Sequence, residues 1–142
     1  MLTIIYMDGS LKNVYQWRFD NFVNFKTDNR SLKLATGLAK NPITHKEALH
    51  ILSHYPHKDV RKAVAYHNNT HQDTLHKLSD PLNTWQVRRA VASHNNTHQD
   101  TLHKLSDDPD EYVRCGVAYH NNTHKDTLHK LSSDPDPSVR WE

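Results

Sequence analysis

The sequence predicts an all-α solenoid made of pairs of short helices, with a small β-hairpin cap at its N-terminus. A segment of twenty residues that begins at Val60 recurs almost unchanged from Val87 and from Val113, and another copy opens at Val139. The three full starts are 27 and 26 residues apart. A fixed period in the twenties is typical of solenoids, in which each unit stacks on its neighbours to bury its apolar face.

The low apolar content of each copy supports the same fold class. Only 35% of the residues are hydrophobic, and a full repeat offers about four large aliphatic side chains, such as Val87, Val91, Leu102 and Leu105. At roughly 1.5–3 kcal/mol for each buried side chain, one repeat gains about 6–12 kcal/mol. Ordering costs about 1–2 kcal/mol per residue, so a single repeat is unstable and stacked repeats are expected.

The positions of the copies divide the chain into two regions. Residues 1–27 are predicted to form the β-hairpin and a capping segment, because Asp8-Gly9 stands between two apolar runs and favours a tight hairpin turn. The alternatives there are an independent hairpin and a partly disordered leader. Residues 28–142 form the repeat region, with repeats over 34–59, 60–86, 87–112 and 113–138 and a partial repeat over 139–142.

Each repeat is predicted to contain two helices, of which the shorter follows a threonine. The threonine acts as N-cap and an acidic residue stands three positions later, as in Thr70 and Asp73. The helix then buries leucines spaced i, i+3, such as Leu75 and Leu78.

The other helix of a repeat is predicted to begin at an Asp-Pro dipeptide, at 108–109 and at 134–135. An acidic N-cap followed by proline at the first helical position favours a helix start. The helix buries Val113, Gly116 and Val117 and ends at a His-Asn-Asn turn. In the longer repeat the equivalent helix starts at 80–81, and the extra residue exposes Trp85.

The run Asp-Pro-Asp-x-x-Val-Arg-x-x-Val-Ala, followed by an Asn/Thr turn and a short Leu-x-x-Leu helix, resembles the leucine-rich repeat variant family. Its Asp-x-x-Val-Arg part is also similar to HEAT repeats. The resemblance covers roughly residues 28–142 and implies a right-handed α-solenoid in which α-helices alternate with shorter, often 3₁₀, helices. The family's Asn-Pro-Asn-Thr-Pro turn survives in part over residues 41–44 and becomes His-Asn-Asn-Thr-His in later copies.

Composition restricts the function classes. The formal net charge of +2 is too small to indicate a nucleic-acid or anionic-membrane ligand by itself. Cys115 is the single cysteine, which excludes an intramolecular disulfide framework and an all-cysteine metal or iron–sulfur site. The sequence has no signal-peptide core and no apolar run of about 18 residues. A soluble, cytoplasmic protein without a cofactor is therefore expected.

The 13 histidines fall mainly into three ladders. One follows the longer helix (His67, His94 and His120), one follows the threonine (His45, His71, His98 and His124), and one lies mid-helix beside the leucines (His50, His76, His103 and His129). A metal-binding or pH-responsive histidine array is one interpretation. We favour the alternative, in which duplication multiplied three structural or surface histidines, and predict no metal site.

An arginine follows the first valine of each repeat: Arg61, Arg88, Arg114 and Arg140. Evenly spaced guanidinium groups suit a row of phosphates, so these are the contacts of an alternative nucleic-acid-binding function. The favoured interpretation is internal pairing, because acidic residues recur near the same helix starts: Asp80, Asp107, Asp108 and Asp134.

The positions at which the copies differ predict a partner-binding surface. Repeat positions three and seven are i, i+4 on the longer helix and form one stripe, which we call the variable stripe. It holds Lys62, Arg89, Cys115 and Trp141 at position three, Tyr66, Ser93 and Tyr119 at position seven, and Thr36 and Lys40 in the first repeat. Trp85 joins these candidates as an exposed aromatic residue. Tyr, Trp and Arg are enriched at interface hot spots, although neutral drift also produces variation.

Near-identical repeats place the same groups at every level, whereas an active site needs one asymmetric constellation. The sequence therefore predicts a non-catalytic protein-interaction scaffold, an adaptor or a stoichiometric inhibitor, with a protein partner. Cys115 has no catalytic partner arrangement and is expected to be a lone exposed thiol. Trp141 is either a site of self-association at the C-terminal open coil or a terminal cap.

Overall fold

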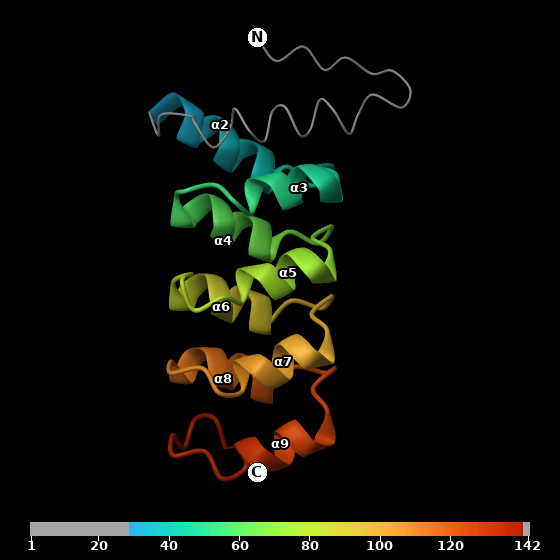
Figure 1. Cartoon of the computed structure of the whole chain (residues 1–142), viewed down its shortest axis with the longest axis vertical. Helices are drawn as coiled ribbons and strands as arrows, with labels where there is room; N and C mark the ends of the chain where they lie inside the picture. Colours follow the sequence, from blue (N-terminus) through green and yellow to red (C-terminus); the bar gives the residue numbers. More distant parts are fainter. Residues whose placement is uncertain (1–28, 141–142) are drawn as a thin grey trace.

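The computed structural model describes residues 29–140, and these form eight α-helices arranged in two columns (Figure 1). One column contains α2 (Asn29–Lys40), α4 (Lys58–Tyr66), α6 (Trp85–Ala92) and α8 (Glu111–Ala118). The other contains α3 (Lys46–Leu52), α5 (Gln72–Leu78), α7 (Gln99–Leu105) and α9 (Lys125–Leu131). In the first column α2 packs on α4, α4 on α6, and α6 on α8.

The described part of the chain is thus an all-helical stack of helix pairs, and residues 29–140 contain no strand. The β-hairpin predicted over 1–27 and the candidate Trp141 lie outside the described residues. The right-handed superhelix stays a prediction.

The core follows the predicted apolar spacing. In the first column α4, α6 and α8 bury valines spaced i, i+4, where α2 buries Ala35 and Ala39, and the second column buries leucines spaced i, i+3. Leu128 in α9 is only half-buried, because no further described helix packs beyond it. The largest fully enclosed side chains are Tyr55, Leu49, Leu75, Leu78, Leu102, Leu105, Val60, Val64, Val87, Val91, Val113 and Val117.

A glycine allows α8 to approach α6 closely. A Cβ atom on Gly116 would lie 3.0 Å from the Cβ of Ala92 and 3.2 Å from the Oγ of Ser93. The same repeat position holds alanine in the two preceding copies, Ala63 and Ala90. Small residues at this position therefore set the spacing of the first column.

The prediction that threonine caps the shorter helices is wrong by one residue. The N-cap of α5 is His71, whose Nδ1 accepts a hydrogen bond from the backbone N–H of Asp73. Thr70 instead donates its hydroxyl to the backbone carbonyl of Val64 at 2.6 Å, and so satisfies the open C-terminal end of α4. The copies at Thr97 and Thr123 make the same bond.

The predicted starts of the longer helices also lie too early. The N-cap of α8 is Asp110 and that of α6 is Thr84, not Asp108 and Asp80. Asp108 accepts from the backbone N–H of Asp110 in the turn before the helix and is otherwise engaged by an arginine of the preceding repeat. After Asp134 the described residues form a turn rather than a helix.

The shorter helices are α-helical rather than 3₁₀, which corrects the expectation from the family resemblance. The backbone N–H of Leu75 bonds to the carbonyl of His71, four residues earlier, and Leu102 and Leu128 repeat this pattern. All eight helices of residues 29–140 are α-helices.

Candidate protein-interaction surface

The histidines that follow the longer helices link each repeat to the one before it. The Nε2 atoms of His67, His94 and His120 lie 2.8–2.9 Å from the backbone carbonyl at the same repeat position of the preceding copy. Their Nδ1 atoms accept from the backbone N–H two residues later, at 3.0–3.1 Å. We call these three residues the turn histidines.

A second group of histidines caps helices. His71, His98 and His124 accept at Nδ1 from the backbone N–H of an aspartate two residues later, at 3.3–3.4 Å. His57 does the same at the start of α4. The carboxylates of these aspartates lie 3.3–3.7 Å from the same ring nitrogens. We call this group the capping histidines.

The mid-helix histidines bond to threonines of the following repeat. The Nδ1 atoms of His50, His76 and His103 lie 2.8–2.9 Å from the hydroxyls of Thr74, Thr101 and Thr127. Most members of the three ladders thus bond within the stack. Within residues 29–140, no three His, Cys, Asp or Glu side chains are grouped so that they could hold a metal ion.

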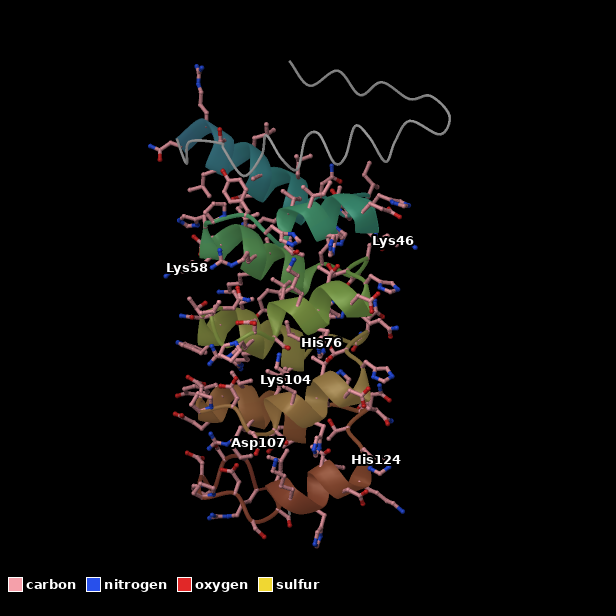
Figure 2. All side chains as sticks on the ribbon, viewed as in Figure 1. Lys46, Lys58, His76, Lys104, Asp107 and His124 are labelled. Atoms are coloured by element: carbon pink, nitrogen blue, oxygen red, sulfur yellow. The ribbon has the colours of Figure 1, made fainter. Side chains whose placement is uncertain are left out.

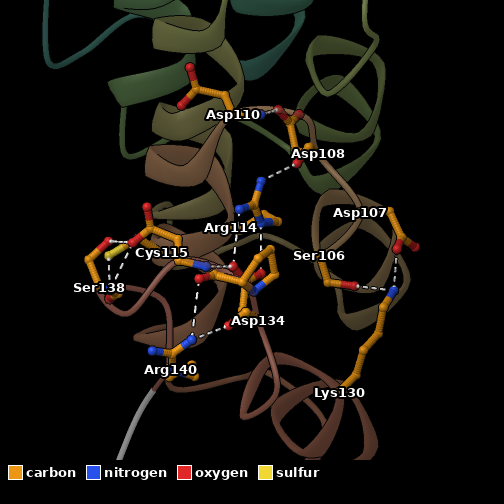
Figure 3. A network of polar contacts seen from close by, with 12 residues as sticks. Ser106, Asp107, Asp108, Asp110, Arg114, Cys115, Lys130, Asp134, Ser138 and Arg140 are labelled. Carbon is orange, nitrogen blue, oxygen red and sulfur yellow. Dashed lines mark hydrogen bonds and ion pairs between the residues drawn. The ribbon is translucent and has the colours of Figure 1, made fainter.

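Lysines of the second column also reach across the repeats. Lys104 donates to the hydroxyl of Ser79, and Lys130 donates to Ser106 and to Asp107. Figure 2 labels Lys104 and Asp107 on the stack, and Figure 3 shows Lys130 between Ser106 and Asp107.

The arginine ladder is engaged inside the stack. Arg88 binds Asp108 through two hydrogen bonds, at 2.6 and 2.9 Å. Arg114 binds Asp134 in the same way at 2.7 and 3.1 Å, as Figure 3 shows. The Asp108 hydrogen bond raises the pKa of Arg88, and the Arg114 hydrogen bond lowers the pKa of Asp134. Both pairs are almost fully enclosed, with 4–14% of each side chain exposed.

The two remaining arginines bind neutral groups. Arg61 donates to the side-chain oxygen of Asn83 at 2.8 Å and to the backbone carbonyl of Tyr55 at 2.6 Å. Arg140 donates to the carbonyl of Asp134 at 2.7 Å. Every guanidinium of the ladder therefore has partners within the chain, which supports internal pairing over a strip of free phosphate contacts.

The variable stripe lies over three shallow depressions between successive helices of the first column. The first, between α2 and α4, has a volume of about 610 Å³ and is lined by Thr36, Lys40, Lys62 and Tyr66 among others. The second, between α4 and α6, is lined by Tyr66 and Ser93. The third, between α6 and α8, is lined by Arg89, Ser93, Cys115 and Tyr119.

Neighbouring depressions share Tyr66 and then Ser93, so the stripe is one continuous surface. Its aromatic members reach into solvent, with 57% of Tyr66 and 61% of Tyr119 exposed. The structure thus brings together all the predicted stripe residues that it describes.

Cys115 differs from the expected exposed thiol. It is half-buried, packs against the core, and its Sγ lies 3.6 Å from the backbone carbonyl of Ser138. Burial raises the pKa of this thiol, so the protonated form dominates at neutral pH.

Trp85 belongs to an aromatic cluster that includes a residue missed in the sequence. Its ring centroid lies 5.5 Å from that of Tyr112, and the guanidinium of Arg89 lies 5.8 Å from the Tyr112 ring. Tyr112 is 52% exposed and lines the third depression. The signal was present in the sequence, because the residue before the first valine also differs between copies: Asp59, Gln86 and Tyr112.

The model of the leucine rich repeat variant family matches residues 85–110, which span α6, α7 and the turn before α8. This match confirms the resemblance at that repeat. Comparisons with curated proteins and with solved structures found no match.

Proposed function

We propose that the stack, with its leucine-rich repeat variant unit at residues 85–110, is a non-catalytic solenoid module that binds a protein partner through the variable stripe. One observation carries the proposal. Most of the polar residues that recur in every copy bond within the stack, whereas the residues that differ between copies line its solvent-facing depressions.

The chemistry of the stripe suits a protein surface. Exposed tyrosines and a tryptophan offer large, rigid contact areas with a polar tip. The depressions are shallow and spread over several helices, which is the extended kind of surface that solenoids use for binding. Such a module acts as an adaptor or as a stoichiometric inhibitor.

The charges of the stripe favour a protein partner that places carboxylates opposite the basic side chains of the stripe. The charged stripe positions that the structure describes are all basic: Lys40, Lys62 and Arg89. Asp59 lies at the edge of the first depression. Electrostatic complementarity of this kind sets orientation and association rate more than affinity.

None of the helices formed by residues 29–140 has the length and apolar character needed to cross a bilayer.

The test compares two variants of the full chain in affinity capture from the source cells. The stripe variant replaces Lys62, Tyr66, Arg89 and Tyr119 with alanine. The control variant replaces four exposed residues of the second column with alanine: Lys46, Gln72, Lys125 and His129. Circular dichroism verifies that both retain helix.

We expect the control variant to capture the same partner as the wild type and the stripe variant to lose it. Equal recovery by both variants would show that binding uses another surface. Loss of the partner by the control alone would place the interface on the second column.

A further inference from the structure

The turn histidines differ from the other histidines because both ring nitrogens bond to backbone groups with fixed roles. A backbone N–H can only donate and a backbone carbonyl can only accept. Nδ1 of His94 therefore accepts from Asn96 at 3.0 Å, and Nε2 donates to the carbonyl of His67 at 2.9 Å. This pattern requires the neutral ring with its proton on Nε2, and His67 and His120 share it.

The hydrogen bonds of the capping and mid-helix histidines do not fix the protonation state of the ring in the same way. A capping histidine that gains a proton loses one backbone hydrogen bond but faces a carboxylate 3.3–3.7 Å away. A mid-helix histidine faces a threonine hydroxyl, which can turn from donor to acceptor. Neither set of hydrogen bonds requires the neutral ring, although burial lowers the pKa of His50.

Protonation of a turn histidine places an N–H on Nδ1, directly opposite a backbone N–H. The bond to the second asparagine of the turn is then lost, and a charge is left in a site where His67 and His94 are each only 8% exposed. The turn that carries the contact to the preceding repeat loses its fixed geometry at the same time.

The charged groups around the turn histidines offer little compensation. The depression that His67 lines also holds Lys40, Lys62 and Asp59, and the one that His120 lines holds Arg89. The depression that His94 lines holds one other titratable side chain, that of Tyr66, and no Asp, Glu, Lys or Arg. The imidazoles of His67 and His120 are the titratable groups that act on His94. Burial lowers the pKa of His94, followed by the effect of these two neighbours, while its bond to the His67 carbonyl opposes the shift.

We propose that the turn histidines His67, His94 and His120 form acid-sensitive joints, which hold successive repeats together when neutral and loosen the stack when protonated.

The sign of the pH dependence follows from proton counting. An unfolded histidine takes up its proton near pH 6.5, whereas burial lowers the pKa of His94 in the stack. The unfolded chain therefore binds more protons over the range below about pH 7, and the free energy of unfolding falls as the pH falls. Carboxylates titrate near pH 4 and do not contribute between pH 7.5 and 5.5.

The chain itself supplies the substitution that tests the joints. In the first repeat Asn41 occupies the place of the turn histidine, and its side-chain oxygen accepts from the backbone N–H of Ile43 at 3.2 Å. Asparagine thus makes the local bond without titrating. The test variant is His67→Asn/His94→Asn/His120→Asn, and the matched control is His71→Asn/His98→Asn/His124→Asn at the capping positions, where asparagine is also a good N-cap.

Thermal unfolding of the full chain is measured at pH 7.5 and 5.5. We expect the melting temperature of the wild type and of the capping control to fall by about 5–10 °C, and that of the turn variant to fall by less than half as much. An unchanged melting temperature in the wild type, or the same fall in the turn variant, would overturn the proposal.

A second measurement uses the wild type alone and does not depend on the stability of a variant. Long-range ¹⁵N–¹H spectra at pH 7.5 distinguish the two neutral tautomers of each imidazole. The proposal requires the Nε2–H form at His67, His94 and His120. A proton on Nδ1 at pH 7.5 would contradict it.

Discussion

Arg61 and Arg88 occupy the same repeat position but bind different partners in the following repeat. Arg61 meets the neutral amide of Asn83, whereas Arg88 meets the carboxylate of Asp108 through two hydrogen bonds. Burial lowers the pKa of Arg61, but the pKa of Arg88 is raised. The comparison shows that the carboxylate, and not the arginine, decides whether enclosing the guanidinium is compensated electrostatically.

The extra residue of the longer repeat explains the difference. It separates the Asp-Pro dipeptide at 80–81 from the helix that follows, and Asn83 takes the place of Asp108. The backbone carbonyl of Asn83 still accepts from Arg88, as the carbonyl of Asp108 accepts from Arg114. The insertion therefore keeps the connection between repeats and removes only its charge.

The largest expected effect is the loss of the ion pair between Arg88 and Asp108. Arg88→Ala leaves the carboxylate of Asp108 enclosed and unpaired, and should lower the free energy of unfolding by about 3–5 kcal/mol. Arg61→Ala leaves only neutral groups and should lower it by about 1–2 kcal/mol. Urea unfolding measures both. Equal losses would mean that the carboxylate does not distinguish the two arginines.

The next effect depends on pH. Asp134→Asn removes the charge opposite Arg114 and should cost about 2 kcal/mol at pH 7. Because the pKa of Asp134 is lowered in the folded chain, this contribution is complete above its ordinary value of 3.8 and is lost as the pH falls through the folded value. Denaturant unfolding of both proteins between pH 7 and 2 should show the curves converging in acid. A constant difference at all pH values contradicts the assignment.

A gain in stability is expected from adding the carboxylate that Arg61 lacks. Asn83→Asp places a carboxylate opposite Arg61 and should stabilise the stack by about 1 kcal/mol at pH 7, since hydrogen bonds between charged groups are the stronger ones. The gain should disappear below about pH 4. Asn83→Ala serves as the control, because it removes the acceptor and should destabilise. A carboxylate that gives no gain at pH 7 would show that Asn83 is already the better partner.

The smallest effects compare the spacing of the helices at two levels. Gly116→Ala forces a Cβ against α6 and should cost about 1 kcal/mol. Gly37→Ala, at the same repeat position in α2, meets no described atom within 4 Å and should stabilise by about 0.5–1 kcal/mol through the helix propensity of alanine. Thermal melts of the two variants should shift in opposite directions. A rise for both would show that α8 can move away from α6 at little cost.

The sequence predicts the stack because its period and apolar spacing are local, repeated signals. The predicted helix starts differ from the observed ones because Thr70 and Asp108 have the residue types of N-caps. Each of them instead bonds to a group outside the helix that follows it. The partner of Asp108 is Arg88, 20 residues earlier. A single copy read alone cannot show such a contact, since it needs the register of two stacked copies.

The candidate surface was predictable to the extent that variation between copies marks it. Tyr66, Ser93 and Tyr119 meet on one face because positions three and seven share a helical side. Tyr112 was missed, as its neighbours on that face come from α6 and not from its own helix. The roles of the histidines were equally hidden, because the carbonyl that His94 reaches belongs to His67, 27 residues earlier.

The bond from one turn to the turn before it has a consequence for the length of the protein. His120 needs only a backbone carbonyl from the preceding copy, and every copy presents one at the same place. Arg114 needs only a carboxylate from the copy that follows it. If one whole unit were deleted or inserted, the same inter-repeat hydrogen bonds could form at the new boundary. The length of the stack can therefore change by one unit at a time through recombination, while the contacts that join the units stay the same.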